Sequence, residues 1–300
     1  MAFRLMTAQD LQIMDRPKIL ETLKYPLYGS FKYDGIRGGV VQHTILSRSN
    51  LPHANYDMAD TFCYAEGVDG EFIVGSPTDP LVCNKTQSEV RSFNKPCTAD
   101  YYVFDICDPK SRWVPYKDRL ADLTRRVETF ADPRIKLVEQ VLLHSPEEVL
   151  AHEAGALELG YEGTMLRSPD GIYKHGESTI LEGIMMKLKR FIDEEVVIEN
   201  FFEALTNTNE QYLDERGLAK RSSAQAGKVL AGTLGGFMAR RSNGQLCMVG
   251  CGKLPHLERL KIWKNQRLYV GKPFTMRYMG YGMKDTPRMP RWHTWRKPGM

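Results

Sequence analysis

The residues best suited to covalent chemistry lie in one short stretch, Phe31-Lys32-Tyr33-Asp34-Gly35-Ile36-Arg37. On a strand, side chains two positions apart point to the same face, so the amine of Lys32 and the carboxylate of Asp34 could share one pocket. Gly35 permits a tight turn, and Arg37 adds a cation with the geometry to bind an anion. The pattern indicates a lysine nucleophile that faces a phosphate, although a solvated strand could carry the same residue types.

Two further carboxylate motifs could serve such a lysine. Asp69-Gly70-Glu71 follows an apolar residue, and two carboxylates around a glycine can bind a divalent ion or a ribose hydroxyl. The same three residues also occur in ordinary turns. Glu162 stands beside a glycine at the start of a predicted strand, which is again weak evidence by itself.

Alternating side chains on two more strands complete the pattern. Lys187 and Lys189 fall on one face of an apolar strand, where they need an anion such as phosphate unless that face is solvated. Tyr102 and Phe104 share one side of another strand, where they could belong to the core or stack on a purine. The seven histidines show no metal-ligand spacing, so we assign them no role.

The elements that must position these residues occupy the first 190 residues. Apolar spacing predicts helices at 54–64, 116–130 and 146–159. Residues 76–98 are rich in Ser, Thr, Asn and Pro, which predicts an irregular segment. We expect an α+β domain, residues 1–190, built largely on antiparallel sheet. Its predicted strands cover 27–33, 39–41, 45–47, 68–74, 101–106, 163–167 and 183–189.

The pattern changes in the second predicted domain, residues 191–300, to short β segments separated by glycine and polar turns. About five strands with one helix, near 255–265, are typical of a small Greek-key β-barrel of the oligonucleotide-binding (OB) fold. Residues 206–226 are predicted to form a long mobile loop. The predicted strands of this domain cover 195–199, 227–241, 244–250 and 273–281.

The net charge of +4 conceals a strong asymmetry. Residues 211–300 carry 18 Lys and Arg against 4 Asp and Glu, a net of +14, whereas residues 1–210 carry 23 against 33, a net of −10. A C-terminal third this basic favours a polyanionic partner, above all nucleic acid. The alternative is a basic surface that only contacts solvent.

The cysteine spacing and the hydropathy indicate the cellular compartment in which the protein acts. The six cysteines form no CxxC pair, which disfavours structural zinc and predicts reduced thiols. No apolar run approaches the membrane-spanning length, and the first residues lack the apolar core of a secretory signal. We therefore expect a cytoplasmic protein without a membrane partner.

Six motifs, taken in chain order, resemble those of the covalent nucleotidyltransferases, and most closely the short ATP-dependent DNA ligases of bacteriophages. The resemblance extends from about residue 25 to the end of the chain and includes the basic and aromatic segment 288–296. One such motif could arise by chance, but six in order are specific. They are Lys32-Tyr33-Asp34-Gly35-Ile36-Arg37, Ser47-Arg48-Ser49, Asp69-Gly70-Glu71, Tyr102-Val103-Phe104-Asp105, Glu162-Gly163-Thr164-Met165-Leu166-Arg167 and Met186-Lys187-Leu188-Lys189.

The resemblance implies an adenylation reaction centred on Lys32. Its amine would attack the α-phosphate of ATP, expel pyrophosphate and hold AMP as a phosphoramidate, with Asp34 as a supporting neighbour. A lysine is normally protonated at neutral pH, so we expect nearby cations or a metal that favour the neutral amine. Glu71 and Glu162 match carboxylates that address the ribose and Mg²⁺.

Five more residues are implied to contact ATP or AMP. Phe104 matches the aromatic residue that stacks on adenine, and Lys187 and Lys189 match ligands of the α-phosphate. Arg37 and Arg48 match cations near the nucleotide and the phosphate of a DNA nick.

The implied acceptor is nicked double-stranded DNA. AMP would pass to the 5′-phosphate of the nick, and the adjacent 3′-hydroxyl would attack that phosphate and release AMP. Such a ligase would act as a monomer in DNA replication and repair, in the host cytosol if the chain is a phage protein. The candidate DNA contacts are Lys85, Arg91, Arg288, Arg291 and Arg296.

Two departures and several rivals accompany this interpretation. Ser30 stands where many relatives carry an acidic residue, and segment 288–296 is only a loose counterpart of the closing motif of larger ligases. An RNA ligase and a GTP-dependent RNA-capping guanylyltransferase would use the same lysine chemistry. A rival of another class is a catalytically inactive polyanion-binding barrel. The residues that argue against such a barrel are Lys32, Glu71, Glu162, Lys187 and Lys189.

Overall fold

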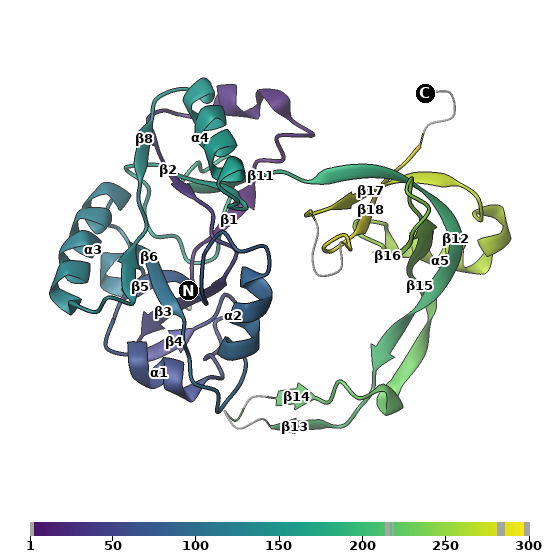
Figure 1. Cartoon of the computed structure of the whole chain (residues 1–300), viewed down its shortest axis with the longest axis horizontal. Helices are drawn as coiled ribbons and strands as arrows, with labels where there is room; N and C mark the ends of the chain where they lie inside the picture. The colour runs from purple at the N-terminus through teal and green to yellow at the C-terminus, as the bar shows by residue number, and fades with distance from the viewer. Residues whose placement is uncertain (1–2, 214–216, 218, 281–285, 297–300) are drawn as a thin grey trace. The chain divides into compact units, whose positions relative to one another are not determined.

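The structure, a computed structural model, describes residues 3–213, 217, 219–280 and 286–296. The chain divides into two compact units, Met1–Arg190 and Phe191–Met300, each with its own hydrophobic core (Figure 1). None of the described helices combines the length and the apolar character needed to cross a membrane.

Two β-sheets form the first unit. The six-stranded sheet contains, in spatial order, β10 (Glu177–Ser178), β1 (Thr7–Asp10), β11 (Met185–Lys189), β9 (Gly163–Arg167), β2 (Leu27–Phe31) and β8 (Val141–Leu143). The five-stranded sheet contains β4 (Thr44–Leu46), β3 (Ile36–Val41), β5 (Val68–Ile73), β6 (Asp100–Ile106) and β7 (Ile135–Leu137). Most neighbours are antiparallel, but β1 runs parallel to β10 and β11, and β6 to β7. The class is α+β, as expected, with mixed sheets.

The helices of the first unit are α1 (Tyr56–Phe62), α2 (Val82–Val90), α3 (Tyr116–Phe130) and α4 (Pro146–Glu158), with short 3₁₀ turns at Pro17–Thr22 and Pro109–Ser111. Two of these helices have an N-cap residue whose side chain accepts a hydrogen bond from a backbone N–H. These residues are Asn55 before α1 and Ser145 before α4. In Figure 1, α4 lies beside the six-stranded sheet, and the other three helices lie beside the five-stranded sheet.

Helix α2 corrects the prediction of an irregular segment at 76–98. Val82, Thr86 and Val90 are spaced four residues apart, so they share one face, and all three are buried. This burial outweighs the low helix propensity of the surrounding Asn, Thr and Ser residues.

Each sheet of the first unit packs a hydrophobic cluster against helices. On the five-stranded sheet, Phe72 stacks on Tyr101 with ring centroids 4.3 Å apart, inside a core closed by α1 and α3. On the six-stranded sheet, Leu166 and Leu188 pack with Val149 of α4. Because strand residues alternate between faces, the residues next to these core positions point the other way.

The second unit is a closed five-stranded barrel. Its strands, in order around the barrel, are β12 (Ile192–Asn207), β15 (Lys228–Arg240), β16 (Leu246–Gly250), β18 (Arg291–Trp295) and β17 (Pro273–Tyr278). Helix α5 (His256–Lys264) buries Ile262 against this core, and 3₁₀ turns occur at Gln225–Gly227 and Gln266–Leu268. The barrel centre is aromatic, with the rings of Phe237 and Phe274 5.0 Å apart.

The segment predicted as a long loop, 206–226, contains regular structure. Strands β13 (Gln211–Leu213) and β14 (Ala219–Arg221) pair antiparallel. Strand β12 also extends to Asn207, where it pairs with the start of β15. The prediction was wrong because cross-strand pairing orders residues whose polar composition is typical of loops.

Candidate active site

Lys32 is the first residue after β2, and backbone hydrogen bonds fix it against the start of β9. Its N–H donates to the carbonyl of Gly163 at 2.8 Å, and the N–H of Glu162 donates to the carbonyl of Lys32 at 3.1 Å. Strand β2 ends at Phe31, so residues 32–35 form a connection rather than the strand that was predicted to aim Lys32 and Asp34 alike.

Two glycines allow this close arrangement. At Gly35, a Cβ atom would lie 2.2 Å from the carbonyl oxygen of Phe72, so no other residue fits between the connection and β5. Gly163 has a φ of +149°, and a Cβ atom there would lie 2.3 Å from the carbonyl oxygen of Leu188. Glycine at these positions therefore lets β9 and β11 bring Glu162 beside Lys32.

Strand register places the other predicted residues on shared faces. Residues opposite each other in an antiparallel pair project to the same side of the sheet. On the six-stranded sheet, Lys187 lies opposite Met165 of β9. On the five-stranded sheet, Glu71 lies opposite both Arg37 and Tyr102.

The nearest partners of Lys32 are carboxylates, not the expected cations. The Nζ atom of Lys32 donates to Oε2 of Glu162, and Oε1 of Glu162 lies 3.5 Å from Nζ of Lys189. Burial lowers the pKa of Lys32, but the charges of Glu162, Glu71 and Asp34 outweigh burial and raise this pKa above its ordinary value. With these neighbours, Lys32 is an ammonium ion.

The other ionisable groups of this cluster are shifted as well. Burial raises the pKa of Glu71 to about 7, although Lys32 and Arg37 act in the opposite direction. Burial favours the protonated form of Glu162, yet Lys32 and Lys189 lower its pKa below the ordinary value. Burial and the charges of Lys189 and Lys32 lower the pKa of Lys187. Such shifts are typical of functional sites.

The carboxylates fit a magnesium site that phosphate oxygens complete. In the part of the chain that the structure describes, no group of three or more His, Cys, Asp or Glu side chains could hold a metal ion. Glu71 and Glu162 are near enough for the charge of Glu162 to raise the pKa of Glu71. Mg²⁺ is commonly held by one or two carboxylates together with water and phosphate oxygens, so these two residues could contribute to such a site.

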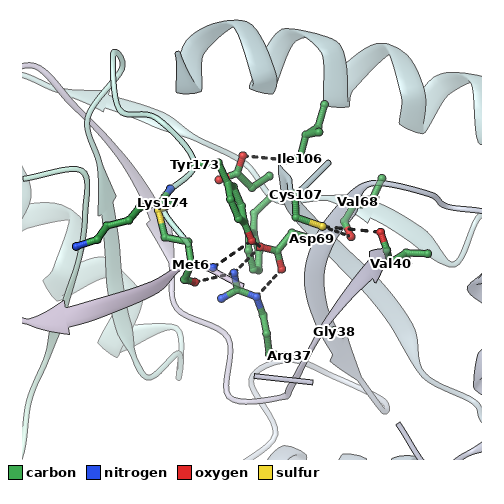
Figure 2. Close-up of polar contacts among 12 residues, drawn as sticks. Met6, Arg37, Gly38, Val40, Val68, Asp69, Ile106, Cys107, Tyr173 and Lys174 are labelled. Atoms are coloured by element: carbon green, nitrogen blue, oxygen red, sulfur yellow. Dashed lines mark hydrogen bonds and ion pairs between the residues drawn. The ribbon is translucent and has the colours of Figure 1, made fainter. Parts of the chain in front are cut away.

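Arg37 is held by a partner that the sequence did not indicate. Its Nε and Nη2 atoms donate to Asp69 at 2.6 and 2.5 Å, and Nη2 also donates to the carbonyl of Met6 at 3.2 Å (Figure 2). Asp69 is fully buried and also accepts a hydrogen bond from the hydroxyl of Tyr173 at 2.6 Å. Asp69 belongs to a motif that we singled out, but no local signal marks Tyr173, which lies 104 residues away.

Phe104 lies at a β-bulge that re-aims its side chain. Asp69 pairs with Asp105 and Gly70 pairs with Val103, so Phe104 is the extra residue of β6. Its half-buried ring has the guanidinium of Arg37 4.6 Å from its centroid. The ring therefore belongs to the same site as Arg37, where one of its faces could take a nucleobase.

The predicted phosphate and DNA contacts of the first unit lie elsewhere on its surface. Arg48 is exposed in the turn after β4, and Arg91 is exposed directly after α2. Lys85 projects from α2 and forms a surface ion pair with Asp79. No hydrogen bond or ion pair between described residues joins these three cations to Lys32. Ser30 is buried in β2, opposite Met165.

The basic residues predicted at the end of the chain have partners within the barrel unit. The backbone of Arg288 bonds to Met279 and Gly280. The guanidinium of Arg291 lies 4.9 Å from the ring centroid of Phe191. Arg296 donates to the Glu195 carboxylate at 2.9 Å.

A half-buried lysine is ion-paired to a carboxylate, and more lysines and acids lie around it on two sheets, an arrangement that suits a nucleotidyltransferase. Residues 6–189 match the family model described as the ATP dependent DNA ligase domain. This match covers more than half of the chain, so the chain belongs to the ATP-dependent DNA ligase family. It is an enzyme that binds ATP, and the RNA ligase and capping-enzyme alternatives are not favoured.

Solved structures extend the similarity to both units. The chain is 26% identical to a Chlorella virus DNA ligase-adenylate, with 99% of each chain covered and a TM-score of 0.54. It is 20% identical to a structure described as a Lig E DNA ligase, with 99% of this chain and 100% of that chain covered and a TM-score of 0.71. The second similarity concerns the fold alone. Among curated protein sequences, none matches this chain.

Proposed function

We propose that this ligase seals nicks in duplex DNA through a lysyl-AMP intermediate on Lys32. The observation that carries the proposal is the Nζ atom of Lys32 in contact with Glu162, beside Lys189. A half-buried amine with carboxylates and lysines around it is suited to charge-neutralised transfer of a nucleotidyl group. The similar solved structures are those of DNA ligases, which supports DNA as the substrate.

In the first step, the ammonium of Lys32 must lose a proton before it attacks the α-phosphate. The carboxylate of Glu162 accepts the hydrogen bond of this ammonium, and because the pKa of Glu162 is lowered, the proton would pass on to solvent. Lys187 and Lys189 would hold the α-phosphate, Phe104 would stack on the base, and Arg37 would lie near the nucleotide. The amine would form the N–P bond as pyrophosphate leaves. Proximity and charge neutralisation are the main contributions of the protein to such a step.

Glu71 and Glu162 would hold Mg²⁺ together with phosphate oxygens. When bound there, Mg²⁺ neutralises phosphate charge and favours the neutral form of Lys32. Asp34 adds negative charge beside Lys32 and would stabilise its protonated form between reactions.

We assign residues 1–190 as the nucleotidyltransferase domain and residues 191–300 as an OB-fold domain that binds DNA. The closed five-stranded barrel with one helix and the basic composition of residues 211–300 support the second assignment. We infer a monomer of phage type that acts in DNA replication and repair. Its proposed DNA or nick contacts are Arg48, Lys85, Arg91, Arg288, Arg291 and Arg296.

A mass measurement followed by a sealing assay tests this function. The protein is incubated with Mg²⁺ and ATP, GTP or NAD, and its intact mass is determined. We expect an AMP adduct from ATP alone, lost in Lys32→Ala and kept in Lys110→Ala, which removes an exposed lysine. Nicked duplex DNA and nicked RNA are then offered to the adduct, and DNA should be sealed.

Three results would contradict the proposal. An adduct that persists in Lys32→Ala would remove the nucleophile from the mechanism. An adduct from GTP alone would indicate capping chemistry. Sealing of RNA but not of DNA would change the substrate.

A further inference from the structure

A closed ring of hydrogen bonds includes Arg37 of the proposed nucleotide site, and Tyr173 is one of its members (Figure 2). The hydroxyl of Tyr173 donates to Oδ2 of Asp69 at 2.6 Å, and Asp69 accepts two bonds from Arg37. Arg37 donates to the carbonyl of Met6, and the N–H of Met6 donates back to the Tyr173 hydroxyl at 3.2 Å. The ring thereby ties the five-stranded sheet to the segment that precedes β1.

The ring is deeply buried, so each bond in it matters. Asp69 is fully buried, Tyr173 is 1% exposed, and the side chain of Arg37 is 16% exposed. A buried ion pair keeps a fixed geometry only when its remaining lone pairs also find donors. The Tyr173 hydroxyl supplies such a donor to Asp69.

The aromatic ring of Tyr173 also contacts a second buried ion pair. Asp105 pairs with Asp69 in the register of β6 and β5, so both carboxylates project to the same side. Asp105 accepts from Nε of Arg119 at 2.7 Å and from Nη1 of Arg167 at 2.6 Å. The guanidinium of Arg119 lies 5.6 Å from the centroid of the Tyr173 ring.

Each of the two ion pairs has an arginine that lies against the ring of Phe104. The guanidinium of Arg37 lies 4.6 Å from the Phe104 ring centroid, and that of Arg167 lies 5.1 Å from it. Beneath them, Tyr173 contacts both ion pairs, through its hydroxyl on one side and its ring on the other.

We propose that Tyr173 is a positioning residue for the nucleotide: through Asp69 it fixes Arg37 against Phe104 before ATP arrives. This inference rests on the proposed function, in which Arg37 and Phe104 contact ATP. Tyr173 itself touches neither substrate nor Lys32. Its hydroxyl reduces the ordering that would otherwise accompany binding, which is how preorganisation strengthens affinity.

The test separates ATP binding from chemistry in Tyr173→Phe, which keeps the ring and removes the hydroxyl. Equilibrium affinity is measured with α,β-methylene-ATP, which cannot adenylate the lysine, and adduct formation is measured at saturating ATP. We expect the dissociation constant to rise by about tenfold, as for a lost hydrogen bond to a charged group, while the saturated rate of adduct formation changes by less than about twofold.

Tyr101→Phe is the matched control. Tyr101 is fully buried on β6, and its hydroxyl donates to the carbonyls of Gly38 and Val68 rather than to a carboxylate. Both variants lose one buried hydroxyl, so both should lower the melting temperature to a similar degree. Only Tyr173→Phe should weaken binding of the ATP analogue.

A double-mutant cycle with Asp69→Asn tests whether Tyr173 acts through Asp69. If it does, adding Tyr173→Phe to Asp69→Asn should weaken binding little further. Unchanged affinity in Tyr173→Phe, equal weakening in Tyr101→Phe, or fully multiplicative effects in the cycle would each overturn the inference. Wild-type adduct formation, followed in parallel, tests the proposed function separately, because the analogue binds without reacting.

Discussion

The charge on Lys32 is set by the charged side chains around it. Its ammonium contacts Glu162, which in turn faces Lys189, and Glu71 and Asp34 add further negative charge. This arrangement stabilises the protonated amine, which has no lone pair for attack on phosphorus. Deprotonation is therefore part of the adenylation step.

The first prediction concerns the pH dependence of that step. At low ATP the rate reports the free enzyme, whose Lys32 pKa lies above the ordinary value for lysine. The second-order rate constant for adduct formation should rise without a plateau between about pH 6 and about pH 9. Intact-mass measurements after rapid quenching would follow it. A plateau below about pH 8 would contradict a raised pKa.

Glu71 links the site to the stability of the fold. Its pKa is raised to about 7 in the folded protein, from an ordinary value of 4.5, with burial as the main cause. Below the unfolded value the carboxyl is neutral in both states. As the pH rises from there through about 7, the unfolded state is ionised first, and folding stability falls by an amount on the order of 3 kcal/mol.

The second prediction follows from this loss of folding stability with rising pH. Glu71→Gln keeps the shape of the side chain and cannot ionise, so it should stabilise the fold at about pH 8 and have little effect near about pH 4. The same change should slow adenylation, because it removes a proposed magnesium ligand. Urea unfolding at the two pH values measures the difference, which would be equal at both if Glu71 were not responsible.

At the scale of the elements, the site depends on how closely β9 and β11 approach each other. The third prediction is that Gly163→Ala destabilises the protein by about 2 kcal/mol or more, because a methyl group would collide with the Leu188 carbonyl and φ is +149°. Gly155→Ala is the control. A methyl group at this position of α4 would meet no atom within 4 Å, so the change should stabilise the helix by about 0.5–1 kcal/mol. Thermal unfolding of both variants decides whether the strain is local to residue 163.

The elements show which features the sequence could predict. Strong periodicity identified α3, which spans Tyr116–Phe130 as predicted, and the strands β5, β6 and β9 to within a residue. Helix α2 and the β13–β14 pair were missed, because burial and cross-strand pairing order them against their local composition.

The sequence predicted the site in the same incomplete way. Each chemically distinctive motif could be located in the sequence, but not the contacts between motifs. Asp69 holds Arg37, and Tyr173 holds Asp69, through side chains that are distant in sequence. Two of the cations expected near Lys32, Lys187 and Lys189, are close enough to interact with its surroundings. The sequence did not indicate that the backbone pairing of residues 32 and 163 would bring the Glu162 carboxylate closest.

At the scale of the whole molecule, the basic charge of the second unit is partly neutralised by its own first strand. Residues 191–210 contain six acidic residues and no basic ones, so residues 191–300 carry 18 basic against 10 acidic residues, a net of +8. Four arginines pair with acids of β12: Arg240 with Glu199, Arg241 with Glu194, Arg277 with Asp193 and Arg296 with Glu195. Exposed cations remain on and around α5, at Lys253, Lys261, Lys264, Arg267 and Lys272.

The fourth prediction is a difference in salt sensitivity between the two activities. If about six phosphates of DNA are contacted, affinity for a nicked duplex should fall by about a thousandfold between about 50 and about 200 mM NaCl, because counterions are released on binding. Formation of the lysyl-AMP adduct from ATP involves no DNA and should fall far less. Binding titrations and adduct measurements in the same buffers compare them, and a parallel decline would argue against DNA binding driven by these cations.

The ion pair at Lys32 also bears on unwanted chemistry in a cell. Acyl phosphates and cyanate modify lysines only through the neutral amine, and a stable product of this kind at Lys32 would remove the proposed nucleophile. Because its carboxylate neighbours keep Lys32 protonated, the resting enzyme presents these electrophiles with a poor target. The contact with Glu162 would thus protect the proposed nucleophile until ATP brings its own charges into the site.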